Sequence, residues 1–512
     1  MEKKISTVAD VHVAKNSCYQ CYAQKRSCDK ILPCCSRCIK KGAKCDYTDY
    51  ILAKRWSQAQ SVTAYRLPQT LLGKDSIELR GYLDHSTFDY FSNIAAVQDL
   101  DTYLTARVYA MLHRAGLDAQ AIVMLYLDSL HTWLPILHSQ KLQESVTRLR
   151  TIPCAEFAVL ILAICLATLP SAPSDCGRET QNSLYATCRS YFGLLQLHRN
   201  NRLETIQSGI LLSVYELGRG MCSAAYLTIG ASATMASVIG LHRPPRQDRI
   251  RSWIEVELRK RVWWGIVFLD RLVFQAESQS RRPMAVEYLR PDFELPIDDH
   301  VWNESDQWSW YPMQQTLVPM LPGIDAGYFA REAQATNLYD QVQHLLRRED
   351  GNSSRSYESE FWKLDKALRE LASILFQNAG SWKINCSAIA LVLTSFLTLH
   401  NVKLDSDAGR DSNPVGAHPP LSPSTSILAI KSTLKIIQTI VQDFVAEADM
   451  YSLPLAGVIS LQKTALAAVE LAKITGHDTA QTEILYIVAE ALKLSGKRWG
   501  LAAKYLEDIE YA

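Results

Sequence analysis

The sequence predicts a mostly α-helical protein in two parts, a small cysteine-rich module at the N-terminus and a large all-α domain after it. Seven of the 13 cysteines lie between Cys18 and Cys45. From about residue 84 to 400, apolar residues recur at three- and four-residue spacing, and runs of the alternating β type are absent. The chain has 512 residues, 48% of them hydrophobic, so it can bury a large core.

The charge is unevenly distributed along the chain. The net charge is +1, but residues 1–60 hold twelve Lys and Arg against five Asp and Glu, an excess typical of a polyanion-binding segment. The first residues lack the apolar core of a signal peptide. The most apolar run, Phe157 to Leu169, is shorter than the ~20 residues that cross a bilayer. We therefore expect an intracellular protein with no membrane partner, whose thiols stay reduced.

The cysteine-rich stretch consists of two C-x2-C-x6-C units in tandem. A CxxC pair places two thiolates on one zinc ion. Six thiolates are two fewer than two four-coordinate sites require, and two sulfurs shared between two zinc ions would remove the shortfall. Metal binding would then supply the folding free energy of so short a segment. The predicted ligands are Cys18, Cys21, Cys28, Cys35, Cys38 and Cys45.

Three alternatives accompany this zinc prediction. Cys34 is a seventh cysteine that could replace Cys35 as a ligand, although only Cys35 has the x2 spacing to Cys38. A disulfide knot is disfavoured by the reducing compartment. A zinc module that contacts proteins, as in RING or LIM domains, has different spacings.

The stretch from Cys18 to Cys45 resembles the fungal Zn(2)-C6 binuclear cluster transcription factors. The resemblance rests on the spacing of the six cysteines, on Pro33 before the fourth ligand and on basic residues between the ligands. It implies that Cys18 and Cys35 bridge the two zinc ions and that the other four ligands are terminal. It also implies double-stranded DNA as the partner.

In that family the short helix after the second cysteine points its C-terminal end into the major groove, and a lysine contacts the bases of a CGG triplet. The matching position here is Lys25, with Arg26 beside it for a base or phosphate contact. The first spacer departs from the family because these two are its only basic residues. Lys40, Lys41 and Lys44 in the second spacer are expected near the DNA backbone. For each lysine the plain alternative is a solvated side chain.

The two parts are expected to be joined by a linker over residues 51–84, after a zinc cluster module over residues 1–50. Many members of the resembled family dimerise through a coiled coil at this place. Residues 46–76 show no apolar a/d spacing sustained over about three heptads. A homodimer therefore remains open but without support.

Residues 85–400 resemble the fungal-specific transcription factor domain, or middle homology region. "YLDSLHTWLPILH" looks like its opening motif, "AAYLTIGASATMASVIGLH" like its central helix pair and "FELPIDDHVW" like its short loop. "EVELRKRVWWGIVFLDR" is similar to its most recognisable segment. The resemblance implies an all-α regulatory domain without catalytic activity. The sequence agrees in having no Gly-rich phosphate loop, HExxH or GxSxG there.

Within this domain the periodicity predicts which side chains are buried. Trp263 and Trp264 are expected in the core. Arg259 to Arg261 are expected on a solvated face, paired with Glu255 and Glu257 at helical spacing. His138 and His242 are interpreted as structural histidines.

The C-terminal part contains a predicted flexible loop over residues 404–426, rich in Asp, Ser, Gly and Pro. Residues 427–512 return to helical periodicity and are expected to pack onto the main domain. The last residues, "YLEDIEYA", are either an acidic and apolar contact for coactivators of the transcription machinery or a frayed helix.

Taken together, the resemblance predicts a zinc-dependent, sequence-specific transcription regulator in the nucleus, and no enzyme. By family habit it is an RNA polymerase II activator, often of a biosynthetic or catabolic gene cluster. The alternatives are an enzyme with an accessory zinc module and a zinc-stabilised interaction protein or corepressor that does not read DNA. A small-molecule effector finds no support in the sequence.

Overall fold

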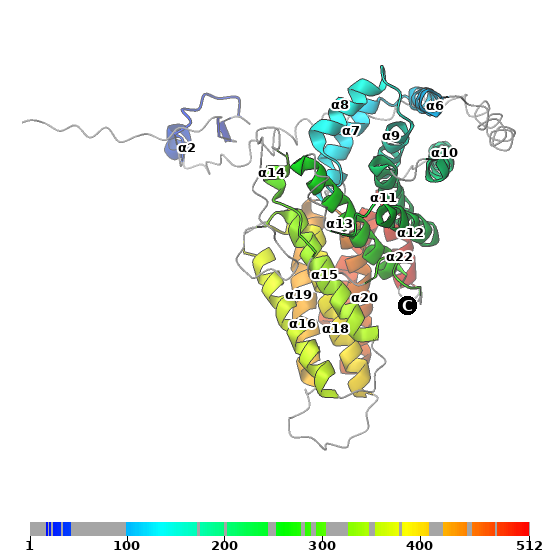
Figure 1. The fold of residues 1–512 in the computed structure, drawn as a ribbon. Helices are drawn as coiled ribbons and strands as arrows, with labels where there is room; N and C mark the ends of the chain where they lie inside the picture. The colour runs from blue at the N-terminus through cyan, green and yellow to red at the C-terminus, as the bar shows by residue number, and fades with distance from the viewer. Residues whose placement is uncertain are drawn as a thin grey trace, which may run out of the picture. The chain divides into compact units, whose positions relative to one another are not determined.

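The computed structural model confirms the predicted fold class (Figure 1). The residues that it describes are 17–18, 20–21, 24–31, 34–41, 99–170, 175–198, 202–243, 252–277, 282–287, 293–303, 326–347, 354–377, 381–408, 423–447, 453–476 and 479–510. Every regular element assigned among them is a helix. The chain divides into two compact units, Met1–Gly73 and Lys74–Ala512. The predicted linker over residues 51–84 lies outside the described residues.

The first unit contains α2 (Ser36–Lys41) and a small core of cysteines. The helices of the second unit are α6 (Leu100–Arg114), α7 (Ala119–Asp128), η2 (Leu130–Thr132), α8 (Ser139–Leu149), α9 (Ala155–Thr168), α10 (Asp175–His198), α11 (Leu203–Gly218), α12 (Cys222–Val238), α13 (Trp253–Ala276), α14 (Asp299–Asn303), α15 (Tyr328–Arg347), α16 (Ser354–Leu375), α17 (Ser381–Ile384), α18 (Cys386–Ala408), α19 (Pro423–Glu447), α20 (Leu455–Thr475), α21 (Thr479–Ser495) and α22 (Gly500–Glu510).

The helical unit consists of two halves, and each half is packed around one central helix. In the N-terminal half, α9 is buried along its whole length and packs against α6, α7, α10 and α11. In the C-terminal half, α18 packs against α15, α16, α19 and α20, and these long helices run side by side in Figure 1. Helix α13 contacts both halves, through α11 and α12 on one side and α15 and α20 on the other. One hydrophobic core therefore extends from α6 to α22.

Helix ends follow local capping rules. The Asp99 carboxylate accepts a hydrogen bond from the Asp101 N–H at 3.1 Å, and Asp118 accepts one from the Ala121 N–H at 3.0 Å. His138 caps α8 by accepting from the Lys141 N–H, which confirms its structural role. Gly240, with φ +75°, follows the end of α12 in the left-handed conformation that glycine adopts without strain.

Helices α18 and α20 correct one part of the membrane reasoning. Each contains a window long and apolar enough to cross a bilayer, so the run at Phe157–Leu169 is not the strongest candidate. In both windows 78% of the residues are buried inside the protein. Their apolar character is thus explained by packing against neighbouring helices.

The predicted loop over residues 404–426 is shorter in the structure at both ends. Helix α18 continues to Ala408, and α19 already begins at Pro423. Residues 409–422 lie outside the described part of the chain. The helices after this loop pack into the main unit, since α19 and α20 contact α18 and α22 contacts α11. Residues 505–510 of the C-terminal stretch form part of α22, whose Tyr505 is buried, and residues 511–512 lie outside the described part of the chain.

Helix α13 corrects the prediction of an exposed basic face. Trp263 and Trp264 are buried as predicted, but Arg261 is fully buried and Lys260 is only 8% exposed. The Arg261 guanidinium donates to Glu257 at 2.9 Å, to Asp299 at 2.8 Å and to the Ile297 carbonyl at 2.9 Å. It therefore ties segment 293–303 to α13, which helical periodicity alone cannot reveal.

Candidate functional site: the cysteine module

Four of the predicted ligands form the core of the first unit. Cys18, Cys21, Cys35 and Cys38 are each at most 3% exposed. Cys28 and Cys34 are half-buried and pack against them. Cys45 lies outside the described residues. A core made of thiols rather than of aliphatic side chains indicates a fold that depends on what the sulfurs bind.

The distances between the sulfurs fit a tetrahedral metal site. Cys18 Sγ lies 3.7 Å from Cys35 Sγ and 3.6 Å from Cys38 Sγ, and Cys21 Sγ lies 3.7 Å from Cys35 Sγ. Thiolates bound at ~2.3 Å to one four-coordinate zinc ion lie roughly 3.8 Å apart. The soft donor set and these three distances thus fit zinc.

The sulfurs that come together belong to both cysteine units. The Sγ atoms of Cys18, Cys21, Cys28 and Cys35 lie within 4.8 Å of one another, and Cys34 is not in this group. The set contains the three cysteines of the first C-x2-C-x6-C repeat and one cysteine of the second repeat. Cys18 of the first repeat in turn contacts both Cys35 and Cys38 of the second repeat. Each of the two repeats therefore contributes a sulfur to the other.

Burial and hydrogen bonding shift the pKa of the cysteine thiols in opposite directions. Burial alone raises the pKa of Cys35, but the Cys38 backbone N–H and the thiols of Cys38, Cys18 and Cys21 lower it to below its usual value. Burial raises the pKa of Cys21. The Cys38 N–H lies 3.4 Å from the Cys35 sulfur and supports its thiolate form.

Helix α2 places one cysteine inside and two lysines outside. Cys38 faces the core, whereas Lys40 and Lys41 in the last turn are exposed. The helix starts at Ser36, whose N–H donates to the two oxygens of Asp29 at 3.1 and 3.2 Å. The hydrogen bond from the Ser36 side chain is the largest cause that lowers the pKa of Asp29. Sequence reasoning missed this cap because Asp29 lies seven residues before the helix.

The turn after Cys21 fixes the predicted base-reading lysine in an unusual backbone conformation. The Arg26 N–H donates to the Cys21 carbonyl at 2.9 Å, and Lys25 has a φ of +50°. This is the hydrogen bond of a Schellman cap, whose left-handed position usually holds glycine. Lys25 and Arg26 are exposed. Lys30, with φ +61°, is the other non-glycine residue with positive φ among those described, and Lys44 lies outside them.

One cluster in the helical unit has the order of a hydrolytic triad but not its accessibility. His400 lies between Ser426 Oγ and Asp365 Oδ1, at 3.1 Å from each. All three residues are at least 95% buried. Arg369 also binds both oxygens of Asp365, at 2.8 and 3.0 Å. The cluster therefore ties α16, α18 and α19 together and offers no reactive group to a substrate.

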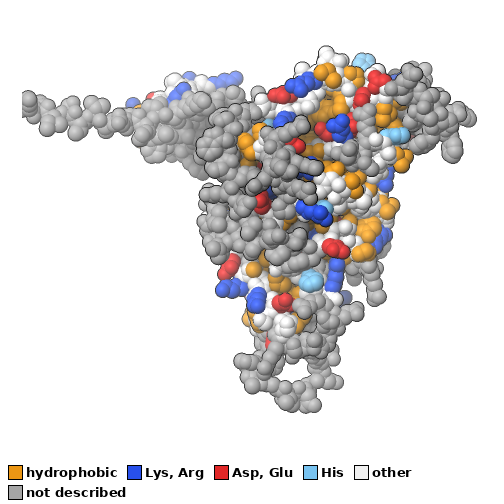
Figure 2. Space-filling model, viewed as in Figure 1, with side chains coloured by type: hydrophobic (Ala, Val, Ile, Leu, Met, Phe, Trp, Pro, Cys, Tyr) orange, Lys and Arg blue, Asp and Glu red, His pale blue; other side chains and the backbone are white. Residues whose placement is uncertain are grey.

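The face of the helical unit in Figure 2 shows acidic and basic side chains interspersed. The described residues on this face form no continuous basic surface. The exposed cations of the cysteine module are therefore better candidates for binding a polyanion than this face of the helical unit.

Comparison with family models places both units among known domains. The fungal-specific transcription factor domain matches residues 123–404, and the fungal Zn(2)-Cys(6) binuclear cluster domain matches residues 16–53. The first match alone covers more than half of the chain. Both resemblances stated from the sequence are thereby confirmed.

Curated relatives are distant and match different shares of the chain. Transcription factor BOA15 of Botryotinia fuckeliana is 28% identical over 35% of this chain and 97% of its own length. The pigment biosynthesis transcriptional activator pigB of Monascus ruber is 24% identical over 37% of each chain. The tropolone cluster transcription factor tropK of Talaromyces stipitatus is 20% identical over 72% of this chain and 74% of its own length.

Proposed function

The chain belongs to the fungal transcription factors that carry a fungal-specific transcription factor domain, and we propose that it binds specific DNA sequences through a two-zinc cluster in its N-terminal module. Its domains and relatives are those of transcription factors rather than enzymes. The observation that carries the proposal is that the sulfur of Cys35 lies close to the sulfurs of all three cysteines of the first C-x2-C-x6-C repeat. Family membership implies a nuclear protein.

The six proposed ligands are those expected from the sequence. Cys21 and Cys28 would be terminal ligands of one ion, Cys38 and Cys45 of the other, with bridging Cys18 and Cys35. The mutual contacts of Cys18 and Cys35 at 3.7 Å support their bridging role. Zinc would cross-link the two C-x2-C-x6-C repeats of the module. The protein's part is to hold six thiolates in a small buried core.

The proposed DNA contacts divide by their position in the module. Lys25 and Arg26 would read CGG-type triplets in the major groove, because they are exposed at the end of the first turn. Lys40, Lys41 and Lys44 would contact phosphates and fix the orientation, without sequence preference. The helical unit, over about residues 85–400 and with the C-terminal helices packed on it, would regulate or recruit.

The proposed target is a biosynthetic gene cluster transcribed by RNA polymerase II. The names of relatives support this choice, since they include a pigment biosynthesis activator, a citrinin biosynthesis activator and a tropolone cluster factor. Activation is proposed over repression because two of these names state it. Dimerisation and coactivator contacts remain further proposals. The DNA selection described next addresses dimerisation.

The test is a selection of random duplex DNA by the full-length, zinc-loaded protein. Two single variants, Cys35→Ser and Cys34→Ser, form a matched pair because they change adjacent cysteines. We expect the wild type and Cys34→Ser to enrich CGG triplets and Cys35→Ser to enrich nothing. The arrangement of the triplets, single or paired, reports whether the protein binds as a dimer.

Other outcomes decide between the alternatives. Loss of enrichment in Cys34→Ser alone would show that Cys34 is the ligand. No enrichment by a wild type that holds two zinc ions would favour the zinc-stabilised interaction protein. Binding with little dependence on salt would argue against phosphate contacts by the lysines.

A further inference from the structure

Helix α12 is uncharged along its whole length, although one of its faces is exposed. Its sequence, CSAAYLTIGASATMASV, contains no Asp, Glu, Lys or Arg, and every other described helix of ten or more residues contains at least one. Helices that are apolar all round normally lie inside a protein. On α12, however, Leu227 is 63% exposed and Val238 is 71% exposed. This face of the helical unit therefore lacks the charges that usually cover a surface helix.

The exposed apolar residues of α12 lie on one stripe along the helix. Leu227, Ala231, Thr234 and Val238 follow one another at spacings of four, three and four residues, which places them on the same face. The Thr234 hydroxyl donates to the Gly230 carbonyl within the helix at 2.9 Å, so its hydrogen bond is already made. These four residues, called the α12 stripe below, have larger side chains at the ends and smaller ones in the middle.

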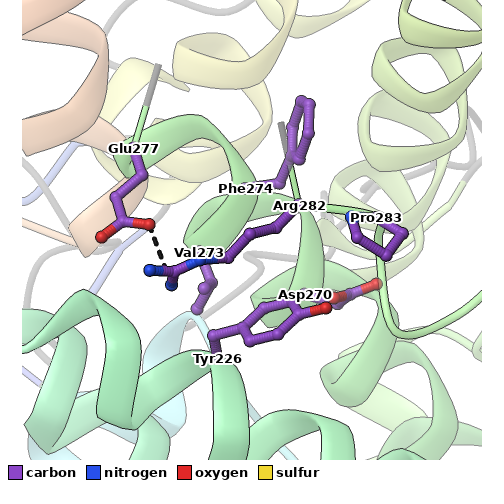
Figure 3. A pocket seen from close by; sticks show the side chains of 7 residues that line it. All are labelled: Tyr226, Asp270, Val273, Phe274, Glu277, Arg282 and Pro283. Carbon is purple, nitrogen blue, oxygen red and sulfur yellow. Dashed lines mark ion pairs between the residues drawn. The ribbon is translucent and has the colours of Figure 1, made fainter. Parts of the chain in front are cut away.

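The neighbouring side of α12 is covered by segment 282–287 of the same chain. The Arg282 guanidinium lies over the Tyr226 ring, 5.4 Å from its centre, as Figure 3 shows. A methyl group on Gly230 would lie 3.9 Å from the Ala285 side chain. Contacts within the chain thus account for this side of α12, whereas both ends of the α12 stripe are exposed.

Leu428 of α19 offers an internal comparison. It is also 63% exposed, but the exposed side chains of Lys431 and Lys435 follow it on the same side of α19. A single apolar side chain among charges is ordinary on a protein surface. The α12 stripe differs from it because the apolar face continues over three turns of helix.

The α12 stripe matches itself when its direction is reversed. Leu227 and Val238 lie equally far from the midpoint between residues 232 and 233, and so do Ala231 and Thr234. Two antiparallel copies would therefore place the larger side chains opposite each other at both ends and the smaller ones opposite each other at the centre. Small central residues let two helix axes approach to about 8 Å. No charge would be buried in the contact.

We propose that the α12 stripe is a homodimer contact and packs antiparallel against the α12 stripe of a second copy of this chain, about a twofold axis. An uncharged partner surface fits this face, because a charged one would lose its hydration here without gaining an opposite charge. The reversed match identifies that surface as the same stripe.

The length of the α12 stripe limits the strength of this dimer. The stripe extends for roughly 16 Å, so by itself it buries less area than a standard stable interface. We therefore expect a weak dimer, with a dissociation constant of about 1–100 µM. The contact lies in the helical unit and depends neither on the zinc module nor on DNA binding.

The first test is sedimentation equilibrium of the full-length, zinc-loaded protein without DNA. Leu227→Glu and Val238→Glu place a charge at either end of the α12 stripe. Leu428→Glu is the matched control, because Leu428 is as exposed as Leu227. We expect the wild type and the control to form the same dimer and each stripe variant to weaken it at least tenfold. Melting temperatures establish that every variant is folded.

The second test examines the antiparallel arrangement. Leu227→Cys chains and Val238→Cys chains with different tags are mixed and treated with a short bismaleimide. We expect crosslinks between the two kinds of chain, because position 227 of one copy faces position 238 of the other. Wild-type chains report the background from native cysteines.

The proposal is overturned if the wild type is monomeric up to about 100 µM. It is also overturned if the dimer persists unchanged in both stripe variants, or if Leu428→Glu weakens it as much as they do. Crosslinks only between identical chains would overturn the antiparallel arrangement.

Discussion

At the scale of single residues, Lys25 combines an unfavourable backbone with an exposed cation. A left-handed conformation costs a non-glycine residue about 1 kcal/mol. The two cysteine units allow an internal comparison, because Lys25 follows Cys21 by four residues and Gly42 follows Cys38 by four. The second cysteine repeat thus has glycine at the matching position. Retaining a lysine in the first cysteine repeat is explained if its side chain has a function there.

This reasoning predicts opposite effects of Lys25→Gly on stability and on DNA binding. Glycine removes the strain at φ +50°, so the module should lose zinc to a chelator no faster than the wild type. The loss of a base contact should weaken binding to the selected DNA site by about 1–3 kcal/mol. Zinc release and gel-shift titrations measure the two effects.

Lys30→Gly is the matched control, because Lys30 has a similar φ of +61° but no predicted base contact. It should preserve the preference for the selected site over unrelated DNA. Unchanged DNA affinity in Lys25→Gly would remove Lys25 from the base-reading set.

Arg261 is the residue that sequence reasoning placed least well. Basic residues beside Glu at helical spacing indicate a solvated face, but Asp299, which completes the buried network, lies 38 residues further along the chain. Only the folding of segment 293–303 onto α13 brings them together. Long-range pairing of this kind has no signature in a periodic pattern.

Replacement of Arg261 should be strongly destabilising. Arg261→Ala leaves Asp299 buried without its cation and Glu257 with Lys260 alone, and we expect a loss of about 3–5 kcal/mol in the free energy of unfolding. The matched surface change, Arg150→Ala, should cost less than ~1 kcal/mol because its ion pair with Asp118 is exposed. Urea denaturation measures both, and equal effects would contradict the buried network.

At the scale of elements, α13 and α15 each bury a glutamate, in opposite electrostatic situations. Glu257 on α13 is bound to Arg261 and Lys260. Glu332 on α15 is fully buried, and burial raises its pKa well above 4.5. No cation is among the causes of that shift, and the Asp299 carboxylate adds to it, so the folded protein favours protonated Glu332 at pH values where the unfolded chain is ionised.

Glu332→Gln should therefore stabilise the protein increasingly as pH rises. The folded state retains a proton that the unfolded chain releases above pH ~4.5, so stability falls with rising pH by up to about 1.4 kcal/mol per unit until the folded pKa is reached. The variant has no such proton and should lack this decline. Unfolding free energies at pH 5.5 and pH 8 measure the difference.

Glu257→Gln is the counterpart, and it should destabilise the protein because it weakens the neutralisation of Arg261. A stabilising effect of both variants, or of neither at pH 8, would contradict the raised pKa of Glu332.

Helices themselves were predictable to the extent that their pattern is local. The buried tryptophans of α13 and the glycine cap of α12 follow from periodicity and backbone chemistry. The triad-like link of Asp365, His400 and Ser426 does not, because its members come from three helices.

At the scale of the whole molecule, the two units have separate cores of different chemistry. One is built from cysteines, and the other from aliphatic and aromatic side chains. The cysteine core was predictable because six regularly spaced cysteines within 28 residues indicate a metal site. The CGG preference proposed for the module rests only on the family resemblance.

Removal of metal should consequently affect one unit alone. A zinc chelator should abolish DNA binding, because the small module loses its folding free energy. The melting transition of the helical unit should shift by less than about 2 °C, since its hydrophobic core contains no proposed ligand. Calorimetry and gel shifts on the same sample test this, and loss of the main melting transition would contradict it.

The packing of the C-terminus into the core also has a consequence for synthesis. A methyl group at Gly218 would collide with the Trp499 ring, and the Trp499 indole donates to the Leu453 carbonyl at 3.0 Å. The surface of α11 thus emerges from the ribosome 281 residues before the tryptophan that covers it. At 5–20 residues per second, this interval lasts roughly 15–55 s. Throughout that time the nascent chain carries an exposed apolar face, which makes it a natural client for chaperones.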